Sequence, residues 1–325
     1  KGEKGMATYN LINSVKGGCG KTTFSIWLAE YLGRENSELT LLVDLDLLGT
    51  SMQVIFYGHN KQNLLCINEI FNGVNDHQDY VQRLELKNGD KLNVIFSSMD
   101  VKDKNKFKSG KNSGYSPVVK HGVFRIGMQK LIKANQYIDN NDVKHFILDM
   151  PPNSDGFSDT AMDCVMNRKY KTLKDGDRKN LFLMVGSDMG QTIATISLLQ
   201  SLLTRTNSLL PSRIFIVFND NISINMGNKD YELRRSILKE AIEKEQLKQE
   251  ELKNIYFLIM CSHKMYTQKL VDGQALCDLE AEDANNVFTH TVIEAWSGYD
   301  DEEFTTIDPI QGDGEITLRK LIKGE

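Results

Sequence analysis

The sequence has little proline and no long apolar run. Proline accounts for only 5 of the 325 residues, and no stretch rich in Pro, Gly or Ser divides the chain, which favours one domain over two joined by a linker. No apolar run approaches the roughly 18 residues that a membrane-spanning helix needs. Residues 1–5 lack the apolar stretch of a signal peptide, and we expect them to be a tag remnant ahead of a natural start at Met6.

Cysteine is scarce and unpatterned. The five cysteines form no Cys-x-x-Cys pair; they are Cys19, Cys66, Cys164, Cys261 and Cys277. An odd, scattered set in a chain without a signal sequence is typical of reduced thiols. We therefore expect a cytoplasmic protein without a disulfide framework.

An overall excess of positive charge is absent as well. The formal net charge is −5, which excludes a polyanion binder that works by total charge alone. Charge is instead uneven along the chain. Lys102–Lys120 holds six lysines against one acid, Arg168–Lys179 holds six basic residues against two acids, and Cys277–Glu315 holds twelve acids and no Lys or Arg. We expect the two basic segments to be inserted surface loops, and residues 277–315 to be an acidic C-terminal region.

The sequence does contain a regular alternation of strand-like and helix-like segments. Its apolar runs are short and nearly continuous, as is typical of strands covered on both faces. Seven such runs are Tyr9–Ser14, Leu39–Asp44, Leu92–Ser97, His145–Met150, Leu181–Gly186, Ile214–Asn219 and Ile255–Met260. Strands that alternate with helices predict right-handed crossovers. The predicted fold is therefore a single three-layer α/β domain over residues 1–325, with a mostly parallel sheet of about seven strands and helices on both faces.

Two of the intervening segments have clear helical periodicity. Thr22–Arg34 is expected to place its apolar residues Phe24, Trp27, Leu28 and Tyr31 on one side. Asp230–Asn254 is longer and highly charged, and its expected apolar stripe consists of Leu233, Ile237, Ala241 and Ile242.

A glycine-rich loop follows the first predicted strand and opens the first predicted helix. It reads SVKGGCGKTT over Ser14–Thr23. The loop glycines are Gly17, Gly18 and Gly20; they let successive backbone N–H groups turn inward, and the helix N-terminus adds a positive dipole end. We expect Lys21 to reach the β- and γ-phosphates of a nucleotide and the Thr22 hydroxyl to ligate Mg²⁺, with Thr23 completing the loop. Cys19 is either a small spacer or a thiol whose oxidation would block nucleotide binding.

This loop and three later segments resemble a known family. KGGxGKTT, with a second lysine at Lys16, is similar to the deviant Walker A box of the ParA/MinD superfamily of P-loop ATPases. Leu42–Asp46 resembles the switch I of that family, Phe146–Pro152 its Walker B and switch II, and Ile255–Leu276 its last sheet segment. The resemblance covers over half of the chain in pieces and implies a P-loop NTPase fold with ATP and Mg²⁺ as its ligands.

The resemblance also implies roles for individual residues. Lys16, Lys21 and Asp46 would form the catalytic set: Lys16 would neutralise phosphate charge on the ATP of a dimer partner, and Asp46 would position the attacking water. Asp44, at the end of a buried strand, and Asp149 would hold the magnesium shell with Thr22, Asp149 through water. Asn219 would read the adenine edge, although a polar residue that ends a strand is the alternative.

Departures from the family pattern leave the subfamily open. Residues 47–51 lack the Pro-Gln of many DNA-partition members, and Cys261-Ser262 stands where proline is common. The iron-protein and cluster-assembly branches need cysteine patterns that this chain lacks. The arsenite and tail-anchor branches need metal-binding cysteines or a Met-rich groove, whereas the 12 methionines are dispersed. Positioning ATPases remain.

The surface on which such an ATPase would act is left open by the sequence. The two basic segments could contact DNA phosphates without sequence specificity, or they could be ordinary solvated loops. A membrane is the less favoured surface: Ile316–Lys323 could form a small amphipathic helix, or simply a C-terminal one.

Two functions therefore remain at this point. In the first, ATP closes a homodimer that binds such a surface, and a protein partner activates hydrolysis. In the alternative, ATP locks a dimeric scaffold or regulatory module for a partner protein with little functional turnover.

Overall fold

The computed structural model describes most of the predicted core. The described residues are 6–34, 39–49, 51–57, 64–71, 80–86, 89–100, 117–134, 137–138, 141–151, 157–166, 173, 176–186, 189–204, 211–219, 229–244, 255–260, 292–295, 306–307 and 318–323. No helix among them is both long and apolar enough to cross a membrane.

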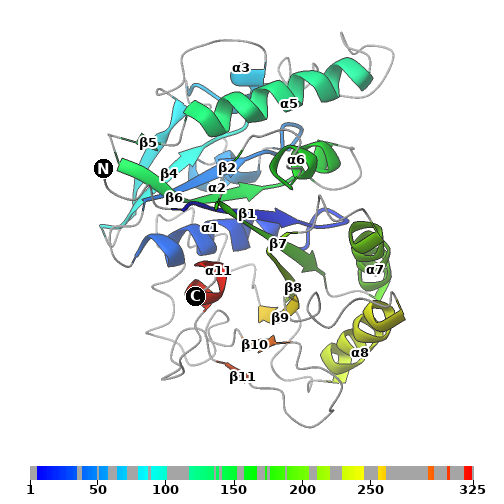
Figure 1. The fold of residues 1–325 in the computed structure, drawn as a ribbon. Coiled ribbons are helices and arrows are strands. Elements are labelled where there is room, and N and C mark those ends of the chain that lie inside the picture. The colour runs from blue at the N-terminus through cyan, green and yellow to red at the C-terminus, as the bar shows by residue number, and fades with distance from the viewer. Residues whose placement is uncertain are drawn as a thin grey trace.

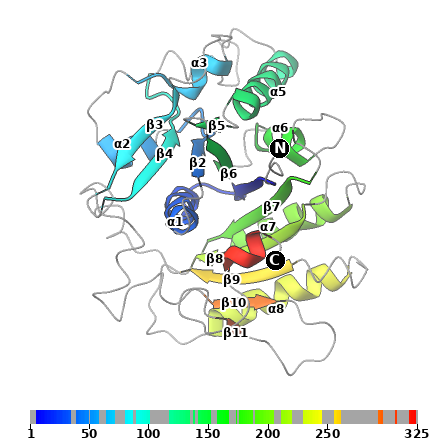
Figure 2. The same ribbon diagram turned by 60° about the vertical axis from the view of Figure 1, so that its left-hand side comes forward.

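One sheet runs through this part of the molecule (Figures 1 and 2). Its strand order is β11-β10-β9-β8-β7-β1-β6-β2-β4-β3, and β5 pairs with β6 beside this path. The seven strands from β9 to β4 in this order are mutually parallel, whereas β3, β5, β10 and β11 pair antiparallel. The strands are β1 (Thr8–Asn13), β2 (Leu39–Asp44), β3 (Gln82–Glu85), β4 (Lys91–Ile95), β5 (Tyr137–Ile138), β6 (Asn141–Asp149), β7 (Arg178–Val185), β8 (Arg213–Asn219), β9 (Ile255–Met260), β10 (Val292–Ala295) and β11 (Thr306–Ile307).

The seven parallel strands are the seven predicted apolar runs. Every residue of β1 is buried, as are all but the first residues of β2 and β8, because both faces of the sheet are covered. The predicted α/β class with a mostly parallel sheet is therefore confirmed. The antiparallel edge strands are additional to the prediction.

Helices cover the sheet on both faces and create two separate hydrophobic cores. The core on one face contains apolar residues of α1, α2 and α11. The opposite core contains those of α3, α5, α6, α7 and α8. The helices are α1 (Lys21–Gly33), α2 (Ser51–Tyr57), α3 (Ile67–Phe71), α5 (Pro117–Ala134), α6 (Phe157–Met166), α7 (Met189–Thr204), α8 (Lys229–Lys244) and α11 (Leu318–Lys323). This is the predicted three-layer arrangement.

The apolar faces of two helices differ from the prediction. In α1 the whole run 24–30 is buried, because this helix packs on the sheet and shares its core with α2 and α11. In α8 the predicted stripe residue Leu233 is 53% exposed, whereas Leu238 is fully buried. Tertiary contacts thus bury Leu238 rather than Leu233, while the predicted stripe residues Ile237 and Ala241 are half-buried.

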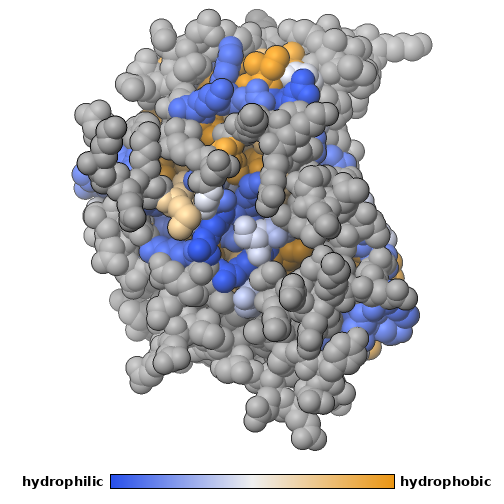
Figure 3. All heavy atoms as spheres, viewed as in Figure 1, coloured by the Kyte–Doolittle hydropathy of each residue, from blue (hydrophilic) through white to orange (hydrophobic). Residues whose placement is uncertain are grey.

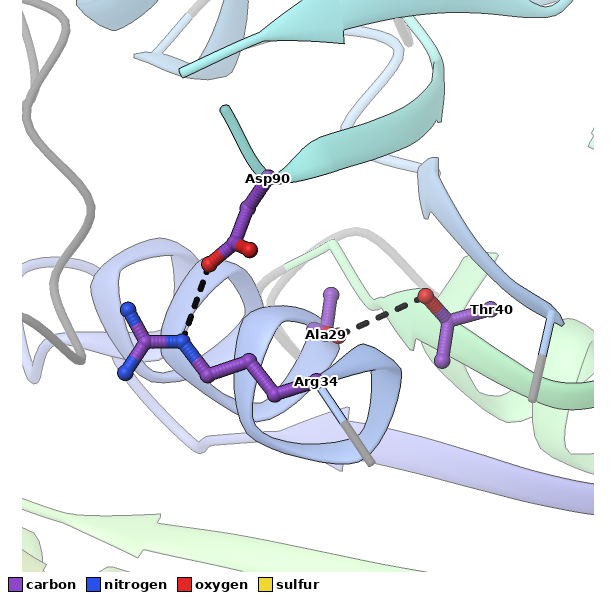
Figure 4. A network of polar contacts seen from close by, with 4 residues as sticks. All are labelled: Ala29, Arg34, Thr40 and Asp90. Atoms are coloured by element: carbon purple, nitrogen blue, oxygen red, sulfur yellow. Dashed lines mark hydrogen bonds and ion pairs between the residues drawn. The ribbon is translucent and has the colours of Figure 1, made fainter. Parts of the chain in front are cut away.

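Polar contacts fix the C-terminal end of α1 (Figure 4). The Nε of Arg34 donates to Asp90 Oδ2 at 2.9 Å, which joins this end to the turn between β3 and β4. On the other side, Thr40 Oγ1 donates to the carbonyl oxygen of Ala29 at 3.4 Å. Since α1 starts at the glycine-rich loop, these contacts also hold that loop relative to β2 and β4.

The C-terminal helix α11 is part of the folded core. Leu318 and Ile322 are fully buried, and Asn180 Nδ2 of β7 donates to the carbonyl oxygen of Ile322 at 3.1 Å. Two apolar residues of the Ile316–Lys323 segment, for which membrane binding is the less favoured hypothesis, therefore pack inside the protein.

The charged segments are only partly described. Arg178 and Lys179, predicted to lie in a basic loop, instead begin β7, where strand pairing with β1 includes them. Residues 117–120 of the other basic segment belong to α5. Residues 102–116 and most of 277–315 lie outside the described part of the chain.

Candidate functional site

The predicted site residues meet at the carboxyl edge of the parallel strands. The glycine-rich loop connects the end of β1 to α1, Asp44 ends β2 and Asp149 ends β6. The strand β6 lies between β1 and β2, with Asp149 opposite both Ile12 and Asp44 in register. Chain segments that are far apart in sequence thus deliver their terminal polar side chains to one edge, where open α/β sheets place their ligands.

The loop has the backbone conformation that its glycines permit. Gly18 and Gly20 have φ values of 81° and 89°, a region that side chains disfavour. Gly20 is the N-cap of α1, and its carbonyl accepts the first helical bond from Phe24 at 2.9 Å. Gly17 and Gly18 are exposed, and a Cβ atom added to either would have no described residue within 4 Å. An anion can therefore approach the loop amides and the positive end of the helix directly.

The two loop lysines have opposite environments. Lys21 is only 8% exposed, and its Nζ donates to Ser14 Oγ at 2.9 Å. The Ser14 hydroxyl in turn donates to the carbonyl oxygen of Lys16 at 2.8 Å. Lys16 itself is exposed. One ammonium group is thus held within the loop while the other faces outward.

Asp149 is joined to the first turns of α1. Its Oδ2 accepts from Thr22 Oγ1 at 2.7 Å and its Oδ1 from Ser25 Oγ at 3.2 Å. Burial raises the pKa of Asp149 to about 6, although the Lys21 ammonium and the Thr22 hydroxyl act in the opposite direction. Thr23, beside Thr22, is half-buried.

Asp44 is the most strongly perturbed acid of the site. Ser97 Oγ donates to its Oδ2 at 2.6 Å, and the Asp46 N–H donates to its Oδ1 at 3.1 Å. Burial, followed by the negative charges of Asp149 and Asp46, raises the pKa of Asp44 to about 8. Three carboxyl groups thus act on one another around this edge of the sheet.

A side chain from another strand donates a hydrogen bond to a backbone carbonyl oxygen of the glycine-rich loop. Asn219, at the end of β8, is buried and donates from Nδ2 to the carbonyl oxygen of Cys19 at 2.8 Å. The Cys19 thiol is buried as well and donates to the carbonyl oxygen of Lys16 at 3.3 Å. Asn219 therefore braces the glycine-rich loop; its role toward adenine stays a prediction, as does a redox role of Cys19.

The residues present fit a nucleotide with a magnesium ion. Asp44 and Asp149 are both 1% exposed, which is costly for carboxylates unless a cation accompanies them. Within the described residues, no group of three or more His, Cys, Asp or Glu side chains could hold a metal by itself. Mg²⁺ commonly uses only one or two carboxylates together with water and substrate phosphates. An anion-binding loop beside Thr22, Asp44 and Asp149 offers that combination.

Several side chains that organise the site belong to none of the sequence motifs. Besides Ser25 and Ser97, they include Asn13, whose Oδ1 accepts from the Ser14 N–H at 2.7 Å and from Ser158 Oγ of α6 at 3.1 Å. Serine and asparagine at strand ends are too common to single out without spatial neighbours. The only sequence signal of Asn13 and Ser25 is that they lie close to the glycine-rich loop, and Ser97 and Ser158 lack even that.

Comparison with known proteins supports this interpretation of the geometry. A family model described as an AAA domain matches residues 8–165, which include the glycine-rich loop, Asp44 and Asp149. Comparison with curated proteins gives no significant match.

Solved structures resemble the chain over most of its length. One is apo McdA from Cyanothece, with a TM-score of 0.58 and 17% identity, covering 87% of this chain and 96% of McdA. Another is a plasmid partition protein from Borrelia burgdorferi bound to AMPPNP, with a TM-score of 0.54, 17% identity, and coverage of 82% and 90%. A third is the septum site-determining protein MinD from Pyrococcus horikoshii with Mg-ADP, with a TM-score of 0.53, 13% identity, and coverage of 85% and 90%.

The sequence-based resemblance is therefore confirmed at the level of fold and domain. The matched segment ends near the middle of the chain, whereas the structural likeness to apo McdA covers 87% of the chain. Residues 8–165 match the AAA domain family, and the chain as a whole has the P-loop fold of the ParA- and MinD-type ATPases.

Proposed function

We propose that this protein is a Mg²⁺-dependent ATPase that works as a nucleotide-switched dimer of the partition or positioning type. The observation that carries the proposal is the meeting of Lys21, Thr22, Asp44 and Asp149 around an open anion-binding loop. The fold supports it, because the similar structures include complexes with AMPPNP and with Mg-ADP.

Each residue of the candidate site has a distinct role in this proposal. The amides of Gly17–Gly20 and the N-terminus of α1 bind phosphate oxygens, and Lys21 exchanges its contact with Ser14 for the β- and γ-phosphates. Thr22, whose hydroxyl donates to Asp149, would hold Mg²⁺ together with Asp44 and Asp149. The ion would supply positive charge that offsets the negative charge of the phosphates. Asp46 orients the attacking water.

Lys16 provides the link between two subunits. Its exposure places a positive charge on the outside of the phosphate loop, whereas Lys21 serves the loop from within. A second subunit that faces this edge would receive the Lys16 ammonium near its own triphosphate, where the added charge stabilises both the dimer and the transition state. ATP would then hold the dimer together until it is hydrolysed.

The dimer is proposed to act in the cytoplasm on an extended anionic surface, with a protein partner that stimulates hydrolysis. Lys102–Lys120 continues into α5, whose described residues include exposed Arg125 and Lys133, and α5 contains no acid. This concentration of positive charge in a protein of net charge −5 supports non-specific contact with DNA phosphates. Two of the similar structures, named as plasmid partition and septum site-determining proteins, support a positioning role.

The decisive experiment measures ATP hydrolysis by the purified protein with and without Mg²⁺ and with and without duplex DNA at low salt. Mg²⁺-dependent turnover that DNA raises several-fold supports the proposal, and the stimulation should disappear as salt is added. ATP binding without measurable turnover, together with normal cellular function of Asp46→Ala, would instead support the ATP-locked scaffold.

A further inference from the structure

The loop that follows β2 holds the Asp46 carboxylate by a short backbone contact. The N–H of Gly49 donates to Asp46 Oδ1 at 2.7 Å. The N–H of Asp46 donates to Asp44 Oδ1 at 3.1 Å. The Asp46 side chain is thus turned onto the backbone of its own loop, and that loop is tied to the buried Asp44 carboxyl group.

The carboxylate occupies the space where a side chain at position 49 would lie. A Cβ atom on Gly49 would be 2.2 Å from Asp46 Oδ2 and 2.6 Å from Asp46 Cγ. Both separations are far below van der Waals contact, so no other amino acid fits while Asp46 keeps this conformation. Gly49 is not among the described glycines with positive φ. The backbone conformation therefore does not require glycine at this position, but the Asp46 carboxylate does.

We propose that Gly49 is a positioning residue for ATP hydrolysis, which uses its N–H and its bare Cα to seat the Asp46 carboxylate at the metal-binding edge. This inference rests on the proposed ATPase function. In this position the Asp46 carboxylate lies close to the metal-binding edge, because its negative charge acts on the carboxyl groups of both Asp44 and Asp149. A carboxylate fixed in advance loses less conformational freedom when it orients a water molecule in the transition state.

The inference is tested with Gly49→Ala in the full-length protein. The added methyl group displaces the carboxylate, so we expect kcat to fall about 10- to 100-fold while KM and the affinity for ATP change by less than about threefold. Gly122→Ala is the matched control. It lies on α5, where an added Cβ atom meets nothing within 4 Å, and it should leave kcat unchanged.

A double mutant separates positioning from a general structural effect. If Gly49 acts through Asp46, Gly49→Ala combined with Asp46→Ala should be no slower than Asp46→Ala alone. The inference would be overturned if the losses of kcat from the two single substitutions added up in the double mutant. It would also be overturned if Gly49→Ala lost ATP binding or kept the kcat of the wild type. Absence of turnover in the wild type would instead overturn the proposed function, so the two failures are distinguishable.

Discussion

At the scale of single residues, the acids of the site determine how the ligand-free protein responds to pH. Burial and neighbouring acids raise the pKa of Asp44 to about 8, and burial raises that of Asp149 to about 6. Each carboxyl group therefore binds its proton more tightly in the folded protein than in the unfolded chain. Its contribution to stability is present at low pH and is lost as the pH rises through these values.

We expect Asp44→Asn to reduce this pH dependence. In EDTA, the Tm of the wild type should fall relative to that of Asp44→Asn by several degrees between about pH 5 and pH 9, because asparagine cannot ionise. Thermal unfolding followed by fluorescence across this range measures the difference. Parallel curves for the two proteins would show that ionisation of Asp44 is not costly in the folded state.

In the proposed ATPase, Lys21 is the residue on which nucleotide binding should depend most. We expect Lys21→Ala to weaken ATP binding at least about 100-fold, because charge-assisted hydrogen bonds to the phosphates are lost from a shielded position. Binding of a fluorescent ATP analogue measures the change. Lys244→Ala, at an exposed position on α8, is the control and should bind normally. If Lys21→Ala kept the affinity of the wild type for ATP, Lys21 would not be a phosphate-binding residue.

At the scale of elements, the sequence predicts the buried strands well and the edges poorly. β2 and β9 have the predicted bounds, because strands covered on both faces must be apolar throughout. The edge strands β3, β10 and β11 are two to four residues long and offer no such run. The burial of α8 was misjudged at Leu233, because packing rather than spacing alone decides which face of a helix meets the core.

The candidate site likewise has residues that the sequence could place and residues that it could not. That Lys21, Thr22, Asp44 and Asp149 lie at one edge of the sheet could be predicted, because each lies in a short motif at or just after the end of a predicted strand, whereas their roles stay predictions. Ser97 could not, because it is 53 residues from the carboxyl group that it contacts and no spacing rule connects them. Only the pairing of β2 with β4 brings these two groups together.

The packing of α11 leads to a prediction about stability. Leu318 is fully buried in the core that α1 shares, whereas Leu233 on α8 is 53% exposed. We expect Leu318→Ala to lower the free energy of unfolding by about 2–5 kcal/mol. The matched change Leu233→Ala should cost no more than about 0.5 kcal/mol. Denaturant unfolding of both variants measures the difference, and equal effects would mean that α11 is not a stable part of the core.

At the scale of the whole molecule, the exposed Lys16 ammonium connects the geometry of the loop to assembly. If one subunit binds ATP as proposed, several negative charges are added beside Gly17 and Gly18, which face solvent. Two such surfaces would repel each other if they met without compensation. In the proposed dimer, a lysine from each subunit, placed at the triphosphate of the other, would turn this repulsion into attraction, and the attraction would exist only while ATP is bound.

This argument predicts that Lys16→Ala separates binding from dimerisation. With a non-hydrolysable ATP analogue and Mg²⁺, we expect the wild type to sediment as a dimer and Lys16→Ala as a monomer, while the affinity for the analogue falls no more than about threefold. Lys244→Ala, which removes an exposed lysine from α8, should still dimerise. Because the attraction is electrostatic, added salt should weaken the wild-type dimer. A Lys16→Ala protein that dimerises as tightly as the wild type would show that the subunits join through another surface, and the switch would then need a different origin.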